Sequence, residues 1–473
     1  MSTVRRIFYN TVMQSAGKIF AALIGLLTVA VLSQHLREHG FGQYSTITAY
    51  LGFFAVLADF GLYLYGVREI SKEGTDHQKI LSNIFGLRLT TSLILLITGA
   101  LIAQALPYDP LVKKTMFVGI AALLFMSLNQ VLIGVFQKHL VQYLVVVSET
   151  LGRVVNLAVI YYAIKNDLPL SVFIVALILG NATTFLLTFL WARKYERFGI
   201  EFDFTIWKQI LRDSWPLVFS VILNLLYFKT DTIILSWYRS QEAVGVYSLP
   251  YKLLEGLLSF PAMFVGLVMP ILSRTASVSW PEFQKTLQRS FDALLLMGIL
   301  VIAVFEFFAR EIINLLERGQ GFADSAGLLQ ILIIAVMIIF CGTLFGYAVV
   351  AVNEQRAMVR GYLLGAILGL VLYFTLIPNF GYWGAAWGTV ATELVVALYA
   401  YNLVKKKSGQ GLSFNILAKS IPAILSMTAF FYFINLPWIL EIALGGTIYI
   451  LLLILFKAVP LSFVREILFL EPN

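Results

Sequence analysis

The sequence predicts an all-α, polytopic membrane protein with about 14 transmembrane helices. Three observations predict this fold class: 59% of the 473 residues are hydrophobic, only 13% are charged, and the mean hydropathy is +0.85. A soluble domain is usually about 45–50% apolar and about 25% charged. Apolar runs recur along the whole chain, and no polar linker separates them. The composition therefore excludes a soluble enzyme, a disordered protein and a secreted disulfide scaffold.

Fourteen apolar segments are long enough to be spanning helices, because about 20 mostly apolar residues are needed to cross roughly 30 Å of hydrocarbon. The first segment exceeds the roughly 7–15 apolar residues of a signal-peptide core and lacks a cleavage signature, so we expect a retained helix. The segments lie near residues 10–36, 44–66, 84–106, 115–137, 143–164, 171–192, 215–236, 249–272, 291–309, 328–350, 361–377, 385–404, 421–438 and 441–459.

Basic residues predict the orientation of these spans. With the N-terminus inside, the inner loops and termini hold 22 of the 34 Lys and Arg residues, the outer loops hold seven, and five fall within spans. Short loops rich in Lys and Arg stay on the cytoplasmic side of a membrane. We therefore expect both termini to be cytoplasmic, and the net charge of +8 to reflect these loops rather than a nucleic-acid partner.

A short repeat suggests how the spans are grouped. Gly42-Gln-Tyr-Ser45 follows the first predicted span and Gly245-Val-Tyr-Ser248 follows the seventh. Six crossings return the chain to the same side, so this spacing predicts two pseudo-symmetric six-helix lobes as parallel repeats, an arrangement typical of transporters. We expect lobes at residues 1–200 and 201–404 and a C-terminal helix pair at 405–473. In the connection between the lobes, the amphipathic segment 204–212 suits a helix lying in the membrane interface.

The sequence contains no motif for catalysis or a cofactor. It has no G-x-x-x-x-G-K-[ST] and no H-E-x-x-H, and its four histidines lie at the ends of loops. The single cysteine, Cys341, lies in an apolar run and allows no intrachain disulfide. We therefore expect no catalytic residue and no cofactor.

Ionisable residues inside the spans are the best sequence indicators of function, because each costs about 2.5–3.5 kcal/mol at the bilayer centre. Some have local explanations. Glu149 and Arg153 lie four residues apart and can neutralise each other. Lys252 can extend to the outer headgroups. The basic members of the set are Lys18, Arg88, Arg153, Lys229 and Lys252, and the acidic members are Asp59, Glu149, Asp231, Glu255 and Glu393.

Other members of this set have weaker local explanations. Arg88 can reach the inner headgroups, and Asp59 can reach Arg68 or a neighbouring helix. Lys18 has no acidic residue one turn away in its own helix, and Lys229 lies beside Asp231 in the sequence rather than one helical turn from it. An excess of cationic groups in a water-filled cavity suits an anionic substrate. Carboxylates in polar or broken helices are ligands that transporters use for a coupling cation.

Several segments carry a family resemblance, and together they extend over most of the chain. They resemble the polysaccharide-transporter branch of the multidrug/oligosaccharidyl-lipid/polysaccharide flippase superfamily, in particular the Wzx-type O-antigen flippases. The segments are Asn10-Thr-Val-Met-Gln-Ser-Ala-Gly-Lys18, Gly40-Phe-Gly-Gln-Tyr-Ser45, Ala58-Asp-Phe-Gly-Leu62, Lys229-Thr-Asp-Thr-Ile-Ile-Leu235, Val244-Gly-Val-Tyr-Ser-Leu-Pro-Tyr-Lys-Leu-Leu254 and Phe380-Gly-Tyr-Trp-Gly-Ala-Ala386.

The resemblance implies a V-shaped pair of lobes that open alternately to either face of a bacterial inner membrane. It implies transport of an undecaprenyl-diphosphate-linked oligosaccharide from the cytoplasmic to the outer leaflet. Membrane lipid and polysaccharide-assembly proteins are the expected partners, and Na⁺ or H⁺ is the expected coupling ion. The residues implied near the diphosphate are Lys18, Arg88, Arg153, Lys229 and Lys252.

The same resemblance implies a cation site. In the related lipid II flippase, an aspartate of the seventh span helps to hold sodium. Asp231 matches that position, and Glu393 offers a second carboxylate from the twelfth span. Lys18 stands alone where that flippase has an Arg-Asp pair, which argues against lipid II as the substrate.

Two other classes of function remain open from the sequence. A cation-coupled multidrug exporter shares the twelve-helix core but is expected to have a more acidic cavity. A membrane enzyme of polysaccharide assembly requires a catalytic cluster on the outer face, and the sequence offers none. A non-transporting scaffold gives no reason to retain costly charges within spans.

Overall fold

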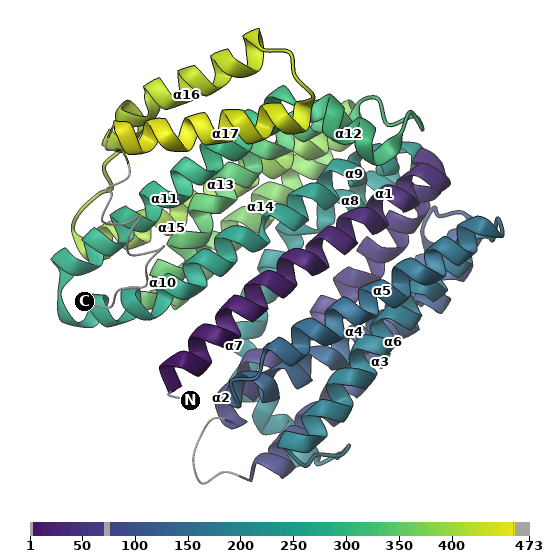
Figure 1. Ribbon diagram of the computed structural model, residues 1–473. Coiled ribbons are helices and arrows are strands. Elements are labelled where there is room, and N and C mark those ends of the chain that lie inside the picture. The colour runs from purple at the N-terminus through teal and green to yellow at the C-terminus, as the bar shows by residue number, and fades with distance from the viewer. Residues whose placement is uncertain (1–2, 71–75, 457, 459–473) are drawn as a thin grey trace. The chain divides into compact units, whose positions relative to one another are not determined.

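In the computed structural model, which describes residues 3–70, 76–456 and 458, the described chain is helical and contains no strand. The helices, labelled in Figure 1, are α1 (Thr3–Leu57), α2 (Leu62–Ile70), α3 (His77–Ala105), α4 (Pro110–Lys138), α5 (Tyr143–Lys165), α6 (Leu170–Tyr195), α7 (Phe204–Phe228), α8 (Thr230–Tyr238), α9 (Gln241–Leu257), α10 (Ser259–Val278), α11 (Trp280–Phe307), α12 (Ala309–Glu317), α13 (Ser325–Ala351), α14 (Gln355–Phe380), α15 (Tyr382–Ser408), α16 (Asn415–Phe433) and α17 (Trp438–Leu455).

The predicted fold class is confirmed. Each of the fourteen predicted spans lies mostly on one helix or on two consecutive helices, and 11 helical segments of the described chain are long and apolar enough to cross a membrane. One of these segments, Gly17–Leu57, has 41 residues and includes the first predicted span and much of the second. The two chain ends, predicted to be cytoplasmic, and the last part of the predicted region 405–473 lie outside the described residues.

Some predicted spans are broken rather than continuous. Helix α1 is kinked at Arg37, whose φ of 54° interrupts the helix between the first two predicted spans. A second break separates α1 from α2, where Phe60 and Gly61 adopt φ of 44° and 66°. The α-helix requires negative φ, so the positive φ values at Arg37 and at Phe60 and Gly61 interrupt the helix at both places. A third break at Lys229 divides the seventh predicted span into α7 and α8.

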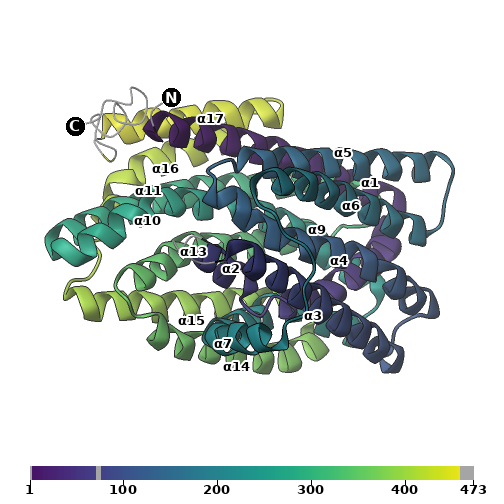
Figure 2. The same cartoon turned by 90° about the horizontal axis from the view of Figure 1, so that it is seen from below.

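The chain forms two compact units. Unit 1 consists of Met1–Gly256, Leu316–Ala323 and Gly365–Gly388, and unit 2 consists of Leu257–Leu315, Asp324–Leu364 and Thr389–Asn473. In unit 1, α5 packs on α6, α6 on α4, and α4 on α3, while α1 lies along α5 (Figures 1 and 2). This bundle carries four of the predicted site residues, Lys18, Arg88, Glu149 and Arg153.

The connection after α6 belongs to the apolar core of unit 1. Phe198 packs with Phe85 of α3 and Phe189 of α6. Asp203 caps α7 by accepting hydrogen bonds from the amides of Thr205 and Ile206. The predicted amphipathic segment 204–212 is the first part of α7. Its apolar residues Trp207 and Ile210 are buried in the same core cluster as Phe85, so this face packs on protein.

Unit 2 contains a separate helix bundle in which α10 and α11 pack on α13, and α16 packs on α17 (Figure 1). Phe291 of α11 stacks on Phe345 of α13 with ring centroids 5.9 Å apart. The Tyr449 hydroxyl of α17 donates to the Leu296 carbonyl of α11 at 3.1 Å. Helix α12 follows the predicted span 291–309, and its nine residues are too few to cross a bilayer.

Candidate transport site

The first charged cluster joins α1 to α5 within unit 1. Arg153 extends to α1 and donates from Nη1 to the Ala21 carbonyl at 2.9 Å. Glu149, one turn earlier on α5, lies within electrostatic range of both Arg153 and Lys18. Lys18 and Arg153 are both exposed on the protein surface. The structure therefore brings together two cations and one carboxylate that the sequence places on two separate spans.

The second pair lies at the break between α1 and α2. Arg88 of α3 donates from Nη1 to Asp59 Oδ1 at 2.7 Å and from Nε to the Ser127 carbonyl at 3.2 Å. Arg88 is only 2% exposed. A buried charge is stable only when it is paired and hydrogen-bonded. This arginine therefore has its charge neutralised locally, and it reaches neither headgroups nor open solvent.

The third cluster surrounds the α7–α8 break. Lys229, at the break, donates to Glu255 Oε1, and Lys252 donates to Glu255 Oε2 at 2.9 Å. The Lys229 ammonium also lies 5.6 Å from the centroid of the Tyr251 ring. All three charged side chains are partly exposed. Two ammonium groups therefore share one carboxylate on α9.

Asp231 lies in the first turn of α8, next to this cluster, and is fully buried. Its Oδ2 accepts a hydrogen bond from the Tyr247 hydroxyl at 2.6 Å, and its Oδ1 accepts from the Thr232 amide at 2.6 Å. Lys229 lies within electrostatic range. The neighbouring Thr230 hydroxyl is buried and has no hydrogen-bond partner within the described part of the chain. The Asp231 carboxylate and the Thr230 hydroxyl, on consecutive residues, offer oxygen atoms of the kind that a hard cation prefers.

Glu393, the other predicted cation ligand, lies on α15 in unit 2, whereas Asp231 belongs to unit 1. Glu393 is buried, as is the neighbouring Thr392. Within the described residues, no group of three or more His, Cys, Asp or Glu side chains is arranged to hold a metal ion. The pairing of Asp231 with Glu393 stays a prediction.

Two tyrosines of this site were not predicted from the sequence. Tyr247 binds Asp231, and Tyr251 lies beside Lys229 with its ring 5.5 Å from that of Tyr247. The repeat could have drawn attention to Tyr247. Tyr247 is the tyrosine of the second Gly-x-Tyr-Ser sequence, and Tyr44 is its counterpart in the first.

Comparison with known families identifies the chain. A model of the polysaccharide biosynthesis protein family matches residues 6–276, which is more than half of the sequence. The chain belongs to this family. A MatE family model also matches residues 216–375. Two curated relatives support the assignment at low identity. A Shigella dysenteriae protein assigned as an O-antigen transporter is 21% identical over 196 residues, and the Staphylococcus aureus capsular polysaccharide biosynthesis protein CapF is 22% identical over 291 residues.

These matches cover 41% and 60% of this chain, and 48% and 72% of the respective relatives, so the chain spans about half the length of the first. Solved structures extend the fold comparison over nearly the whole chain. The lipid II flippase MurJ in an inward closed conformation has a TM-score of 0.78 at 13% identity and covers 97% of this chain and 100% of MurJ. An inward-facing MATE family multidrug resistance transporter has a TM-score of 0.67 at 13% identity. The match covers 84% of this chain and 98% of that transporter. This member of the polysaccharide biosynthesis family therefore shares its fold with MurJ and with this MATE transporter.

Proposed function

We propose that this protein moves a lipid-linked oligosaccharide with a diphosphate head, of the undecaprenyl-diphosphate class, across a bacterial inner membrane by alternating access. The observation that carries the proposal is the shared contact of Lys229 and Lys252 with Glu255, beside the buried Asp231. Transport of a polar head requires such a site, because polar groups that enter hydrocarbon without partners lose several kcal/mol of hydration, about 2–7 per group.

The charge balance of this cluster suggests how an ion gradient drives the cycle. Lys229 and Lys252 are matched by Glu255 and Asp231 when both carboxylates are ionised. A cation bound at Asp231 cancels one negative charge and leaves the cluster with a net positive charge. Since opposite charges attract more strongly in a site of low dielectric constant, cation binding then favours binding of the diphosphate. The ion and the substrate are thus coupled through Lys229.

The cluster on α1 and α5 supplies a second positive region. Lys18 and Arg153 outnumber Glu149, so this cluster attracts anions without a coupling ion. Arginine and lysine side chains bind phosphate oxygens through charge-assisted hydrogen bonds. Arg88 was predicted in the same role, but its contact with Asp59 suits it better to holding α3 against the α1–α2 break.

Na⁺ or H⁺ is the proposed coupling ion, held by Asp231 with the Thr230 hydroxyl and, as a further proposed ligand, Glu393. The protein itself supplies the oxygen atoms and the surrounding dry site. The proposed membrane orientation has cytoplasmic termini, consistent with the basic inner loops. The proposed partners are the lipid-linked substrate, membrane lipid and proteins of polysaccharide assembly.

A cation-coupled drug exporter is the second candidate, because the MatE model matches residues 216–375. A cavity for cationic drugs favours acidic side chains. The spans of unit 1 instead contain five basic residues and four acidic ones (Lys18, Arg88, Arg153, Lys229 and Lys252 against Asp59, Glu149, Asp231 and Glu255). The charge balance therefore favours an anionic substrate.

The test is to delete the gene in its host, restore it on a plasmid, and measure both surface polysaccharide and the leaflet that holds undecaprenyl-linked intermediates. We expect the deletion to trap intermediates on the cytoplasmic leaflet. We expect the intact gene to release them, and Lys229→Gln/Lys252→Gln to release them poorly at normal protein levels. The matched control is Lys405→Gln/Lys406→Gln, which removes the same charge from the exposed end of α15.

Normal polysaccharide after the deletion, with no trapped lipid, would contradict flipping and favour the drug exporter. Completed units left unpolymerised on the outer leaflet would favour an assembly enzyme. Equal export by the site variant and the α15 control would remove the lysine pair from the mechanism.

A further inference from the structure

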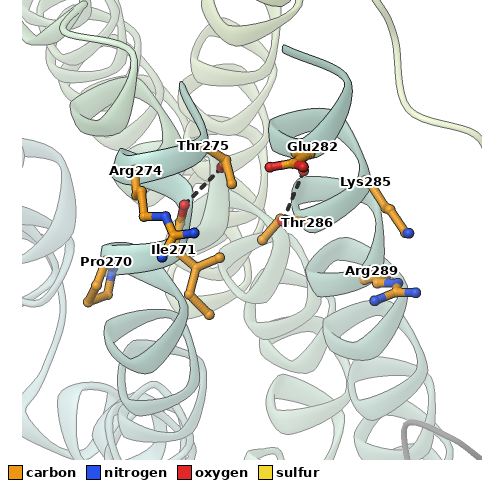
Figure 3. Close-up of a pocket in the computed structure, with 8 residues that line it drawn as sticks. All are labelled: Pro270, Ile271, Arg274, Thr275, Glu282, Lys285, Thr286 and Arg289. Atoms are coloured by element: carbon orange, nitrogen blue, oxygen red, sulfur yellow. Dashed lines mark hydrogen bonds between the residues drawn. The ribbon is translucent and has the colours of Figure 1, made fainter. Parts of the chain in front are cut away.

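Unit 2 contains a basic cavity that the transport site does not use. It has a volume of about 490 Å³ and lies between the end of α10 and the beginning of α11 (Figure 3). We propose that this cavity binds the phosphodiester headgroup of an anionic membrane phospholipid. The proposal concerns a bound lipid that is not transported, so it does not rest on the proposed function.

Three basic side chains line the cavity. Arg274 comes from α10, and Lys285 and Arg289 come from α11 (Figure 3). Glu282 is the single acidic side chain of the lining. All four side chains are exposed, and among the residues that the structure describes none of the three cations forms an ion pair. The lining therefore has an excess of two positive charges.

The position of Lys285 and Arg289 makes a bound anion favourable. They lie four residues apart on one helix, and like charges at this spacing destabilise a helix. A phosphate between them and Arg274 removes that repulsion. Arginine forks match phosphate oxygens in pairs, and lysine acts as a point charge.

The hydroxyl groups of the cavity do not compete for this role. Thr275 donates to the Ile271 carbonyl at 2.8 Å, and Thr286 donates to the Glu282 carbonyl at 3.0 Å (Figure 3). Each hydroxyl proton is therefore used within its own helix. The basic side chains remain the donors available to an anion.

Apolar side chains around the cavity favour a lipid over a free phosphate ion. Pro270 and Ile271 line it, and Ile271 is 53% exposed. At the turn between α10 and α11, Val278 is 76% exposed and Trp280 is 38% exposed. Tryptophan is enriched at membrane interfaces, where its ring lies at the level of the headgroups. A ligand with both a charged head and an apolar body satisfies this surface, whereas inorganic phosphate satisfies only the cations.

The cavity also lies where the sequence predicts the cytoplasmic side, because Arg274, Lys285 and Arg289 belong to a predicted inner loop. Basic pockets between helices on this side of a membrane bind anionic headgroups. We therefore expect the lipid to come from the inner leaflet.

The test uses the purified full chain in neutral detergent and measures bound lipid by native mass spectrometry during titration. The probes are phosphatidylglycerol, phosphatidylcholine and inorganic phosphate. We expect saturable binding of phosphatidylglycerol, weak binding of phosphatidylcholine, and no displacement by millimolar phosphate. Each basic residue near an anionic lipid contributes a factor of about five. Arg274→Gln/Lys285→Gln/Arg289→Gln should therefore weaken binding roughly 100-fold.

The matched control is Lys405→Gln/Lys406→Gln/Lys407→Gln, which removes three charges from unit 2 outside the cavity. It should weaken binding only a few-fold, by about as much as general surface charge allows. Glu282→Gln removes the one negative charge of the lining and should strengthen binding about fivefold. Glu282→Gln tests the site by a gain in lipid affinity. The proposal can therefore still be tested if the triple variant fails to fold.

Three results would overturn the proposal. Equal binding of phosphatidylcholine would show that charge does not select the ligand. Displacement by inorganic phosphate would indicate a soluble anion rather than a lipid. Equal losses in the cavity variant and the α15 control would reduce the effect to surface charge. None of these measurements involves transport, so they are independent of the flippase assay.

Discussion

Gly42 and Gly245 let α1 and α9 pack backbone against backbone. A methyl group on Gly42 would overlap the Gln241 carbonyl oxygen and lie 2.9 Å from the Gly245 amide nitrogen. A methyl group on Gly245 would overlap the Glu38 carbonyl oxygen. The two glycines hold the same position in the repeated Gly-x-Tyr-Ser sequences. The two copies of the repeat therefore lie at one helix contact. Each copy supplies a glycine, the small residue that close helix packing requires.

We expect Gly42→Ala and Gly245→Ala each to destabilise the fold by about 1–3 kcal/mol, the usual cost of overpacking. The atoms in the way belong to the backbone and cannot rotate aside. Gly52→Ala is the control, because Gly52 lies on the same helix and has nothing within 4 Å of its missing side chain. Alanine is a better helix former than glycine by about 0.8–1.0 kcal/mol, so this variant should be neutral or more stable. Thermal unfolding in detergent compares them, and equal melting of Gly42→Ala and Gly52→Ala would refute the contact.

The buried ion pair between Arg88 and Asp59 makes a second prediction about stability. Removing one partner leaves an unpaired buried charge, which typically costs about 3–5 kcal/mol. We expect Arg88→Gln and Asp59→Asn each to lower the melting temperature and the amount of protein in the membrane. The double variant should recover much of the loss, because it leaves no unpaired charge. Lys407→Gln, which breaks the exposed pair with Glu354, should cost only about 0–1 kcal/mol. Additive losses in the double variant would show that the pair does not couple α3 to the α1–α2 break.

The helices were predictable because each span requires about 20 apolar residues, and this requirement is local in sequence. The partner of Arg88 was not predictable in the same way. Asp59 lies 29 residues earlier, and only the packing of α3 against the α1–α2 break brings the two together. The sequence alone suggested headgroups or the substrate anion as the contact of Arg88.

The contacts of Asp231 illustrate the same limit. Its identity as a costly intramembrane carboxylate was visible in the sequence. Its bond to Tyr247 was not, because it depends on the break at Lys229 and on α9 packing beside α8. An aromatic residue in an apolar helix gives no sign that its hydroxyl holds a carboxylate.

The proposed cation site at Asp231 and Thr230 predicts that the stability of the protein depends on the coupling ion. A cation that binds the folded state stabilises it by about 2.7 kcal/mol at 100 times its dissociation constant. If Na⁺ is the coupling ion, the melting temperature of the wild type should rise when Na⁺ replaces choline. Asp231→Asn should lose this response. Thr230→Val should weaken it without a large loss of basal stability, because its hydroxyl has no partner among the described residues. A full Na⁺ response in both variants would exclude this site.

Glu196, which follows α6 outside the spans, makes a prediction about pH. Burial raises the pKa of this carboxyl, but hydrogen bonds from Lys138 at 2.6 Å and His139 at 2.9 Å outweigh burial and hold the pKa below its ordinary value of 4.5. A lowered pKa in the folded state contributes stability above the unfolded-state pKa, and this contribution is lost as the pH falls through the folded-state value.

We therefore expect wild-type stability to fall more steeply than that of Glu196→Gln as the pH decreases below 4.5. Just above that pH, the variant should be less stable than the wild type. Melting curves across this range measure the difference. Parallel curves at every pH would mean that the Glu196 contacts to Lys138 and His139 contribute nothing through charge.

The orientation of the chain makes the last prediction, and Cys341 makes it practical to test. It is the only cysteine, so Cys341→Ser leaves a background for single-cysteine labelling. Gly199→Cys places a thiol in the connection between α6 and α7, where the glycine has nothing within 4 Å of its missing side chain. Asn166→Cys places one on the exposed turn between α5 and α6. Because basic loops stay on the cytoplasmic side, an impermeant maleimide added to intact spheroplasts should label position 166 and spare position 199 until the membrane is opened. The reverse pattern would invert the topology and, with it, the leaflet assigned to the α10–α11 cavity.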